Sequence, residues 1–179
     1  MKSEILHLLR HADGYVSGQQ LCETFGVSRT AVWKVINQLK EEGYVIDSVQ
    51  NKGYRITEYP DIITASEIES LLLDDSGNMQ GICRHIQYFD KTDSTNNQAK
   101  LAAEKNAPDG TLFVAECQTG GRGRRGKTWE SPAGSGIWMS LLLRPDISPE
   151  SASMLTLVLA VAMVDAINEE VQDAKCYVK

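Results

Sequence analysis

The sequence predicts an α+β fold in two parts, residues 1–60 and residues 61–179. Residues 1–60 carry three apolar stripes at helical spacing and then two alternating segments. Residues 61–179 alternate strand-like and helix-like segments, which is typical of layered α/β folds. The charge also changes at this boundary, because residues 1–58 contain seven basic and seven acidic residues whereas residues 59–179 contain eleven and seventeen.

The first part is expected to contain three short helices. Four apolar side chains recur at helical spacing near the N-terminus, namely Ile5, Leu6, Leu8 and Leu9. Ser17, with Gln20 three residues later, forms the capping-box pattern that begins a second helix. Ser28 caps a third helix over residues 29–42, which turns its own apolar stripe inward.

Two alternating segments follow the third helix and predict a β-hairpin. They cover residues 44–49 and 54–57, and the Asn-Lys-Gly sequence at residues 51–53 is typical of a hairpin turn. Three helices followed by a hairpin make a winged helix-turn-helix. A helix of this width fits the major groove of DNA, and the hairpin wing can reach adjacent phosphates or the minor groove.

The third helix and the wing carry the residues that we expect to bind DNA. Residues 28–40 contain three basic residues and no acidic one, and the wing adds two more, so a module without net charge can present a basic face. The alternatives are a solvated helix face and a winged helix that binds protein. The predicted DNA-binding residues are Ser28, Arg29, Thr30, Trp33, Lys34, Asn37, Lys52 and Arg55.

The second part is expected to begin with a connecting helix and to continue as a layered fold. Thr64 and Glu67 form another capping-box pattern, which predicts that the connecting helix begins near residue 64. Strands are predicted at residues 85–90, 111–117 and 136–144, and helices at residues 96–105 and 151–171, the last of them long and buried.

Cysteine spacing and apolar run length predict a cytoplasmic protein. The four cysteines lie far apart, with neither a Cys-x-x-Cys pair nor the spacing of zinc ligands. Reduced thiols are therefore expected. The longest apolar stretch, residues 154–166, is interrupted by Thr156 and Asp165 and is shorter than the roughly 18 residues that span a bilayer. Neither a signal peptide nor a membrane anchor is expected.

The most informative stretch is QTGGRGRRGKTWESPAG, residues 118–134, which contains four basic residues between positions 122 and 127. Glycines let backbone N–H groups approach an anion, and arginines bind phosphate oxygens in bidentate fashion. A match to G-x-G-x-x-G is present, but no apolar helix follows it, which disfavours a dinucleotide-binding fold. A basic surface loop and an RGG-like nucleic-acid contact remain alternatives.

These residues resemble the bifunctional biotin–protein ligase and biotin operon repressor family over essentially the whole chain. The resemblance rests on the winged helix with Ser28-Arg29, on Asp-Ser-Thr-Asn at residues 93–96, and above all on residues 121–134. It implies a biotin–[biotin carboxyl-carrier protein] ligase that forms biotinyl-5′-AMP from biotin and ATP with Mg²⁺ and transfers biotin to a carrier lysine. It also implies a dimer that represses transcription at operator DNA when it holds the adenylate.

The resemblance further implies the residues of the site. Biotin would contact Ser94, Thr95, Asn96, Gln118, Arg122, Gly123, Arg124 and Lys179. The nucleotide would contact Gly121, Arg124, Arg125 and Trp129. Arg122, Arg124 and Lys179 would act in catalysis, because a carboxylate and a phosphate repel each other. No metal-ligating residue is expected.

The residues at the end of the chain lead to a second hypothesis about the function. The family has a Lys-Trp-Pro-Asn-Asp motif, of which this chain supplies only Lys179, so it is expected to hold the first part of the ligase domain. The alternative function is a ligand-sensing winged-helix transcription factor without catalytic turnover. The Arg/Gly/Trp/Ser-Pro constellation favours the enzyme, and the end at Lys179 favours the sensor.

Overall fold

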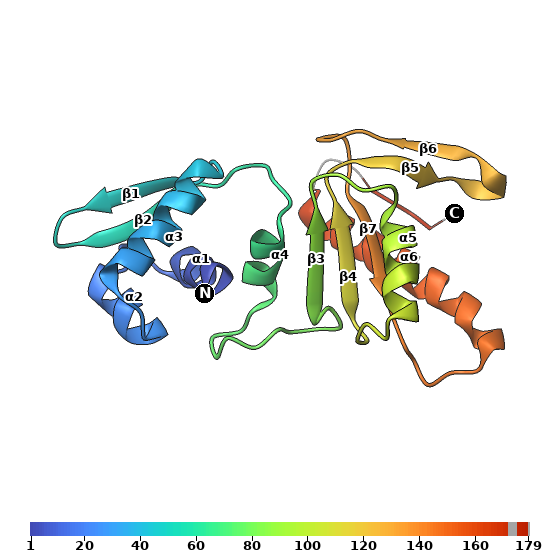
Figure 1. The fold of residues 1–179 in the computed structure, drawn as a ribbon, viewed down its shortest axis with the longest axis horizontal. Helices are drawn as coiled ribbons and strands as arrows, with labels where there is room; N and C mark the ends of the chain where they lie inside the picture. Colours follow the sequence, from blue (N-terminus) through green and yellow to red (C-terminus); the bar gives the residue numbers. More distant parts are fainter. Residues whose placement is uncertain (172–174, 179) are drawn as a thin grey trace. The chain divides into compact units, whose positions relative to one another are not determined.

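The computed structural model of the 179-residue chain describes residues 1–171 and 175–178, without the side chain of Arg124 (Figure 1). It divides into two units, Met1–Leu143 and Arg144–Lys179. The first unit contains both the winged helix-turn-helix and a small sheet with its hairpin.

The predicted winged helix-turn-helix is confirmed. Its helices are α1 (Lys2–His11), α2 (Gly18–Phe25) and α3 (Arg29–Glu41), and its wing consists of β1 (Val45–Val49) and β2 (Gly53–Glu58). Ser17 Oγ accepts a hydrogen bond from Gln20 N, and Ser28 Oγ accepts one from Ala31 N, as the capping patterns predict. The apolar stripes of the three helices meet in one core, which the wing closes with Ile46 and Ile56.

The wing is attached to the segment that joins α1 to α2. Val16 pairs with Tyr54 through two backbone hydrogen bonds of 2.9 Å, which form an isolated bridge beside the two-stranded wing. Gly53 has a φ of +117°, and a Cβ atom there would lie 2.0 Å from the carbonyl oxygen of Val16. Glycine is therefore required for the wing to approach so closely.

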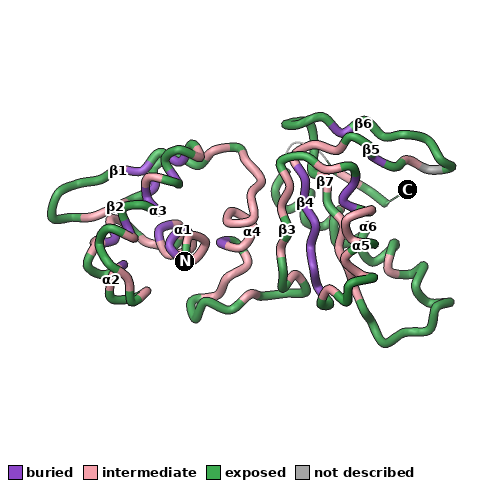
Figure 2. Tube along the Cα trace, in the orientation of Figure 1, coloured by how far each residue is buried: buried purple, intermediate pink, exposed green. Residues whose placement is uncertain are grey.

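The remainder of the first unit follows the predicted order with an added hairpin. The elements are α4 (Ala65–Leu72), β3 (His85–Phe89), α5 (Thr95–Glu104), β4 (Thr111–Ala115), β5 (Gln118–Arg122), the 3₁₀ helix η1 (Arg124–Gly126), β6 (Thr128–Ser131) and β7 (Trp138–Leu142). The sheet has the order β3-β4-β7, with β3 parallel and β7 antiparallel to β4. Helix α5 lies against β4 and β7. Figure 2 shows β4 as a continuous buried strand.

The β5–β6 hairpin is not among the strands that the sequence predicts. Gln118 pairs with Ser131, and Arg122 pairs with Thr128, in an antiparallel hairpin. A glycine-rich segment carries little strand propensity, so its sequence gives no alternating signal. The backbone nevertheless pairs because the two strands satisfy each other's N–H and C=O groups.

The last helix also differs from its prediction. The second unit contains η2 (Pro149–Ser153) and α6 (Met154–Glu170), and α6 is exposed or half-buried along its described length, not buried. An apolar sequence indicates that a helix can be buried, but it does not say which element covers it. Among the described residues of this unit, no helix or strand other than η2 and α6 is present.

The helical stretch Pro149–Glu170 is also longer than the apolar run of the sequence suggests. It has 22 residues, and an 18-residue window within it has a mean hydropathy of 1.7, which by length and composition suffices to cross a membrane. The expectation that no segment is long enough is therefore wrong. A core helix of a soluble protein meets the same criterion, because both are apolar all round.

Candidate functional site

The predicted biotin and nucleotide residues lie on the β5–β6 hairpin and at the start of α5. A cavity of about 340 Å³ lies along the hairpin and includes Gln118, Gly121 and Trp129 in its lining. Ser94 is the N-cap of α5 and Thr95 is its first residue, and both are buried, whereas Asn96 is exposed. Arg122 ends β5, and Gly123 follows it.

Backbone bonds bring the start of α5 to the start of β5. Thr119 N donates to Thr92 O at 2.9 Å, and Gly120 N donates to Asp93 O at 2.7 Å. These two bonds connect segments that are 27 residues apart in the sequence. They place the predicted biotin contacts from two distant parts of the chain in one site.

The side chain of Gln118 is held by neighbours on two elements, α5 and β6. Its Oε1 accepts hydrogen bonds from Thr95 N at 2.8 Å and from Thr95 Oγ1 at 3.2 Å, and its Nε2 donates to Ser131 Oγ at 3.0 Å. Thr95 Oγ1 also lies 2.9 Å from Ser140 Oγ on β7. A backbone N–H can only donate, so the bond from Thr95 N fixes which end of the carboxamide is the oxygen.

Ser131 and Ser140 were not among the predicted site residues. Ser131 is buried and belongs to the Trp-x-Ser-Pro stretch, so its position in that stretch was an available signal. Ser140 has no such signal, because it stands inside an ordinary strand and reaches Thr95 only through the packing of α5 on β7.

Asp93 organises the first turn of α5. Its carboxylate accepts hydrogen bonds from Asn97 Nδ2 at 2.6 Å and from Gln98 Nε2 at 2.8 Å. These bonds, together with one from the backbone of Ser94, hold the pKa of the Asp93 carboxyl well below its usual range. The carboxylate thus remains charged and holds the helix start that carries Ser94 and Thr95.

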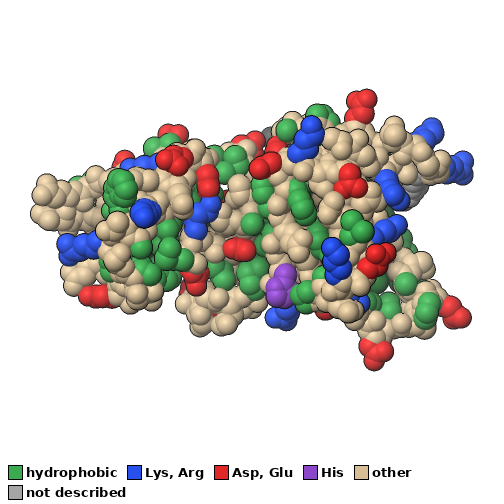
Figure 3. Space-filling model, viewed as in Figure 1, with side chains coloured by type: hydrophobic (Ala, Val, Ile, Leu, Met, Phe, Trp, Pro, Cys, Tyr) green, Lys and Arg blue, Asp and Glu red, His purple; other side chains and the backbone are tan. Residues whose placement is uncertain are grey.

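The tip of the hairpin carries the positive charge. Gly123 N donates to Lys127 O at 2.8 Å, and Arg125 in η1 has a left-handed backbone with a φ of +57°. Arg122, Arg125 and Lys127 are exposed, and none of them forms an ion pair with another described residue. Figure 3 shows basic side chains over the free end of this hairpin.

Three predicted site residues remain, namely Trp129, Arg124 and Lys179. The Trp129 side chain is 58% exposed, so its ring is open to a planar partner. Arg124 begins η1. Lys179 lies outside the described residues.

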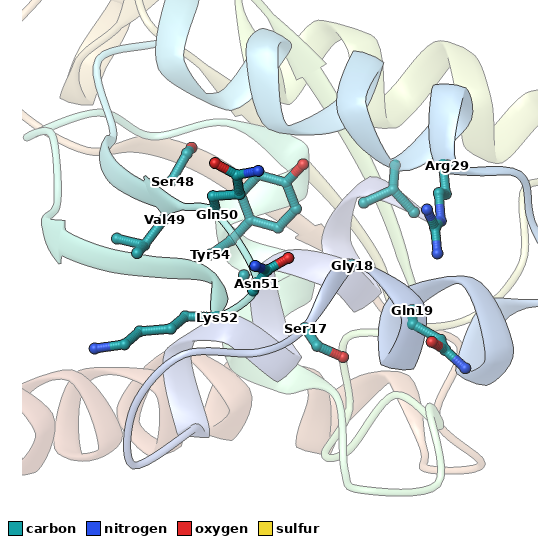
Figure 4. Close-up of a pocket in the computed structure, with 12 residues that line it drawn as sticks. Ser17, Gly18, Gln19, Arg29, Ser48, Val49, Gln50, Asn51, Lys52 and Tyr54 are labelled. Carbon is teal, nitrogen blue, oxygen red and sulfur yellow. The ribbon is translucent and has the colours of Figure 1, made fainter.

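A second cavity, of about 520 Å³, lies between the start of α2, Arg29 and the tip of the wing (Figure 4). Figure 4 shows Gln19 and Arg29 on one side and Gln50 and Asn51 on the other. Its lining contains no acidic residue, and the three carboxamides were not predicted from the sequence, because amides carry no charge signal. The lining residues are Ser17, Gly18, Gln19, Arg29, Val32, Ser48, Val49, Gln50, Asn51, Lys52, Gly53 and Tyr54.

The predicted DNA-binding residues fall on more than one surface. On α3, Arg29, Thr30, Trp33 and Lys34 are exposed and Asn37 is half-buried, whereas the hydroxyl of Ser28 is engaged as the helix cap. Arg55 lies on the other face of the wing from Tyr54. There its guanidinium is 3.8 Å from an Asp47 carboxylate oxygen and 5.2 Å from the centre of the Tyr15 ring.

Comparison with protein families matches residues 2–55 to an HTH domain and residues 88–179 to the biotin/lipoate A/B protein ligase family. The bifunctional ligase/repressor BirA of Bacillus subtilis is 42% identical over 170 residues, which are 94% of this chain and 51% of that protein. A biotin–[acetyl-CoA-carboxylase] ligase of Paracoccus denitrificans is 39% identical over 77 residues, 43% of this chain and 31% of that one.

Among solved structures, the biotin protein ligase from Aquifex aeolicus in complex with biotin and ATP is similar, with 36% identity and a TM-score of 0.41. That similarity covers 48% of this chain and 35% of the other. The chain spans about half the length of the bifunctional relative it matches. Residues 56–87 lie between the two matched regions.

Proposed function

We propose a function from one premise: the chain belongs to the biotin/lipoate A/B protein ligase family, whose model matches residues 88–179. In the proposed reaction, the biotin carboxylate attacks the α-phosphate of ATP, which gives biotinyl-5′-AMP and pyrophosphate. A lysine of a biotin carboxyl-carrier protein then attacks the activated carbonyl, and AMP leaves. Biotin is preferred to lipoate because the Paracoccus relative is named a biotin ligase.

The observation that carries this proposal is a fixed polar network at the base of the β5–β6 hairpin together with a basic tip whose described side chains form no ion pair. Gln118 and Thr95 are held in place by direct hydrogen bonds, so they require little reorganisation when a ligand binds. Arg122 and Arg125 lie on the same hairpin without acidic partners among the described residues. A polar ligand with an anionic end fits such a site.

The proposed chemistry requires charge neutralisation and orientation and does not require a protein nucleophile. The carboxylate and the α-phosphate are both anionic, and the transition state spreads additional charge over the phosphoryl oxygens. We assign Arg122, Arg124 and Lys179 to neutralise that charge. Trp129 and the Gly121 backbone are assigned to the nucleotide. Holding two reactants in line supplies much of the rate acceleration.

The ATP is expected to bring Mg²⁺ with it. Over the described residues, no group of three or more His, Cys, Asp or Glu side chains is placed to hold a metal ion. Mg²⁺ commonly binds through substrate phosphates with one or two carboxylates, so the proposal assigns it to the nucleotide.

Pyrophosphate release tests the ligase proposal. The chain is mixed with Mg²⁺ and ATP, and either biotin or lipoate is added. We expect pyrophosphate release only with biotin. Release with lipoate alone would place the chain with the lipoate ligases. DNA binding that depends on biotin, without any release of pyrophosphate, would instead favour the ligand-sensing transcription factor.

We propose that the N-terminal module binds operator DNA and represses transcription. The chain is proposed to act in the cytoplasm, as a homodimer when it holds the adenylate. The support is the match of residues 2–55 to an HTH domain together with the acid-free cavity beside Arg29. Basic and amide groups are the groups that bind phosphates and base edges. Sedimentation of the chain with and without biotin and ATP tests the dimer, which should appear only with both.

A further inference from the structure

We infer that helix α4 and the loop after it are an integral part of the DNA-binding module, held there by Glu67, and that this module meets the ligase part at Gly81. The sequence alone predicts a boundary at residue 60. Residues 59–80 lie between the two family-matched regions, so neither match assigns them a role. The inference rests on contacts inside the first unit and requires neither biotin nor DNA.

Glu67 joins α4 to the winged helix-turn-helix through both of its carboxylate oxygens. Arg10 Nη2 on α1 donates to Glu67 Oε1 at 2.5 Å, and the Tyr44 hydroxyl donates to Glu67 Oε2. The side chains of Arg10 and Glu67 are only 18% and 15% exposed. An ion pair this shielded is screened less by water than a surface pair, and its geometry adds two charge-assisted hydrogen bonds.

The same carboxylate departs from the predicted capping box. Thr64 Oγ1 accepts from Glu67 N at 3.2 Å, as that pattern requires. The Glu67 side chain is instead committed to Arg10 and Tyr44, away from the cap. Burial and the bond to Glu67 both raise the pKa of the Tyr44 hydroxyl above its usual value, so the hydroxyl remains a donor at neutral pH.

A second contact lies one turn further along α4. His7 Nδ1 on α1 lies 2.8 Å from the carbonyl oxygen of Ser70, and Ser70 is fully buried. Residues three apart on a helix share a face, so Glu67 and Ser70 form one docking face against α1. The Arg10 guanidinium also lies 4.5 Å from the centre of the Tyr59 ring, which fixes the chain that leads from β2 towards α4.

The loop after α4 folds back on the helix. Gln80 N donates to Leu72 O at 2.7 Å, and Leu73 pairs with Met79. Asp74 Oδ1 closes the turn by accepting bonds from the backbone N–H groups of Ser76 and Asn78. Residues 72–80 are therefore anchored on α4 and belong with it.

Gly81 lies between residues that bond to α4 and residues that bond to the segment before β4. Beyond it, Arg84 N donates to Gly110 O at 2.9 Å, which ties the chain to the segment before β4. Gly81 has a φ of +74°, and no heavy atom lies within 4 Å of the position its Cβ would take. A left-handed glycine in open space permits rotation that other residues resist. Because α4 also approaches β3, it stands where the two parts meet.

Hydrogen exchange of the whole chain, measured by mass spectrometry, tests this inference. An isolated eight-residue helix is too short to protect its amides, so protection in α4 reports its docking. We expect protected α4 amides in the unaltered chain. Glu67→Ala should accelerate exchange in α4 by at least about tenfold and leave α1 and α3 within about twofold. Tyr44→Phe removes one of the two bonds and should give a smaller increase confined to α4.

Glu69→Ala is the matched control, because Glu69 is a half-buried residue of the same helix whose side chain has no hydrogen bond or ion pair to a described residue. It should leave exchange in α4 unchanged. Unprotected α4 amides in the unaltered chain, or equal effects of the two alanine variants, would overturn the inference. If Glu67→Ala accelerates exchange throughout the module, the Tyr44→Phe variant is the deciding test. An increase in exchange that is equal over α1 to α4 in Tyr44→Phe would contradict a local role of Glu67 in docking α4.

Discussion

At the scale of single residues, the bond from Thr95 N to Gln118 Oε1 organises the proposed biotin site. It sets the direction of the carboxamide, and the hydroxyl of Ser131 holds the other end. The Gln118 side chain is therefore already ordered before a ligand binds, so binding does not cost the conformational entropy of that side chain. Ser131 acts through Gln118, so it is a positioning residue in the proposed site.

Ser131→Ala tests this positioning role. The variant removes one of the anchors of Gln118 and leaves its Nε2 without that partner, so we expect biotin affinity to fall about 3-fold to 10-fold, the equivalent of roughly one net hydrogen bond. Isothermal titration of biotin measures it. Ser135→Ala is the control, because Ser135 is exposed and bonds only to Pro132 O among the described residues. Equal affinities for both variants would refute the positioning role.

Asp93 gives the chain a pH dependence whose sign follows from its lowered pKa. Its contribution to stability is complete above the ordinary carboxyl pKa of about 4 and is lost as the pH falls from there towards the lowered value. Asp93→Asn should therefore lower the Tm near neutral pH, and the difference from the unaltered chain should shrink below about pH 4. Calorimetry over that range measures it. A Tm difference independent of pH would contradict the assignment.

At the scale of elements, the caps and stripes of α1 to α3 made the first part predictable. Ser17 and Ser28 cap their helices because each hydroxyl accepts a hydrogen bond from an otherwise unpaired backbone N–H group. Such a cap depends only on residues that are close in the sequence, so it can be predicted from the sequence. The β5–β6 hairpin gave no such signal, since its pairing satisfies backbone groups and not side-chain preferences. The exposure of α6 was equally hidden, because covering a helix depends on other elements.

The attachment of the wing yields an element-level prediction. Gly53→Ala forces a Cβ against the Val16 carbonyl at a positive φ, so we expect the free energy of unfolding to fall by about 2 kcal/mol or more. Urea unfolding measures the change. Gly14→Ala is the control, because no atom lies within 4 Å of its Cβ position, and it should change stability by less than about 0.5 kcal/mol. Similar losses in both variants would show that the wing does not depend on this contact.

At the scale of the whole molecule, the decisive contacts join residues far apart in the sequence. Thr95 and Gln118 are 23 residues apart, and Arg10 and Glu67 are 57 apart. Family resemblance named Thr95 and Gln118 as ligand contacts, but their bond to each other depends on how α5 packs on the sheet. Nothing local in the sequence marks Arg10 and Glu67 as partners, because both types are common on helix surfaces.

The proposed DNA surface makes a prediction about salt. Lys34 is exposed on α3, and loss of one phosphate contact should reduce the slope of log affinity against log salt by roughly 0.9. We expect Lys34→Met to weaken binding to mixed-sequence duplex DNA and to lower this slope, as measured by fluorescence anisotropy. Lys91→Met, an exposed lysine outside the HTH match, is the control. An unchanged slope in Lys34→Met would exclude Lys34 from the DNA contact.

The most direct test of the central claim is detection of biotinyl-5′-AMP by mass spectrometry after the chain is incubated with biotin, ATP and Mg²⁺. We expect this adenylate in the complete mixture and with Ser135→Ala, its absence without biotin, and a strong reduction with Arg122→Ala. Equal yields from Arg122→Ala and the unaltered chain would contradict the role of the basic tip. The absence of adenylate from a chain that binds both biotin and ATP would contradict the ligase function itself.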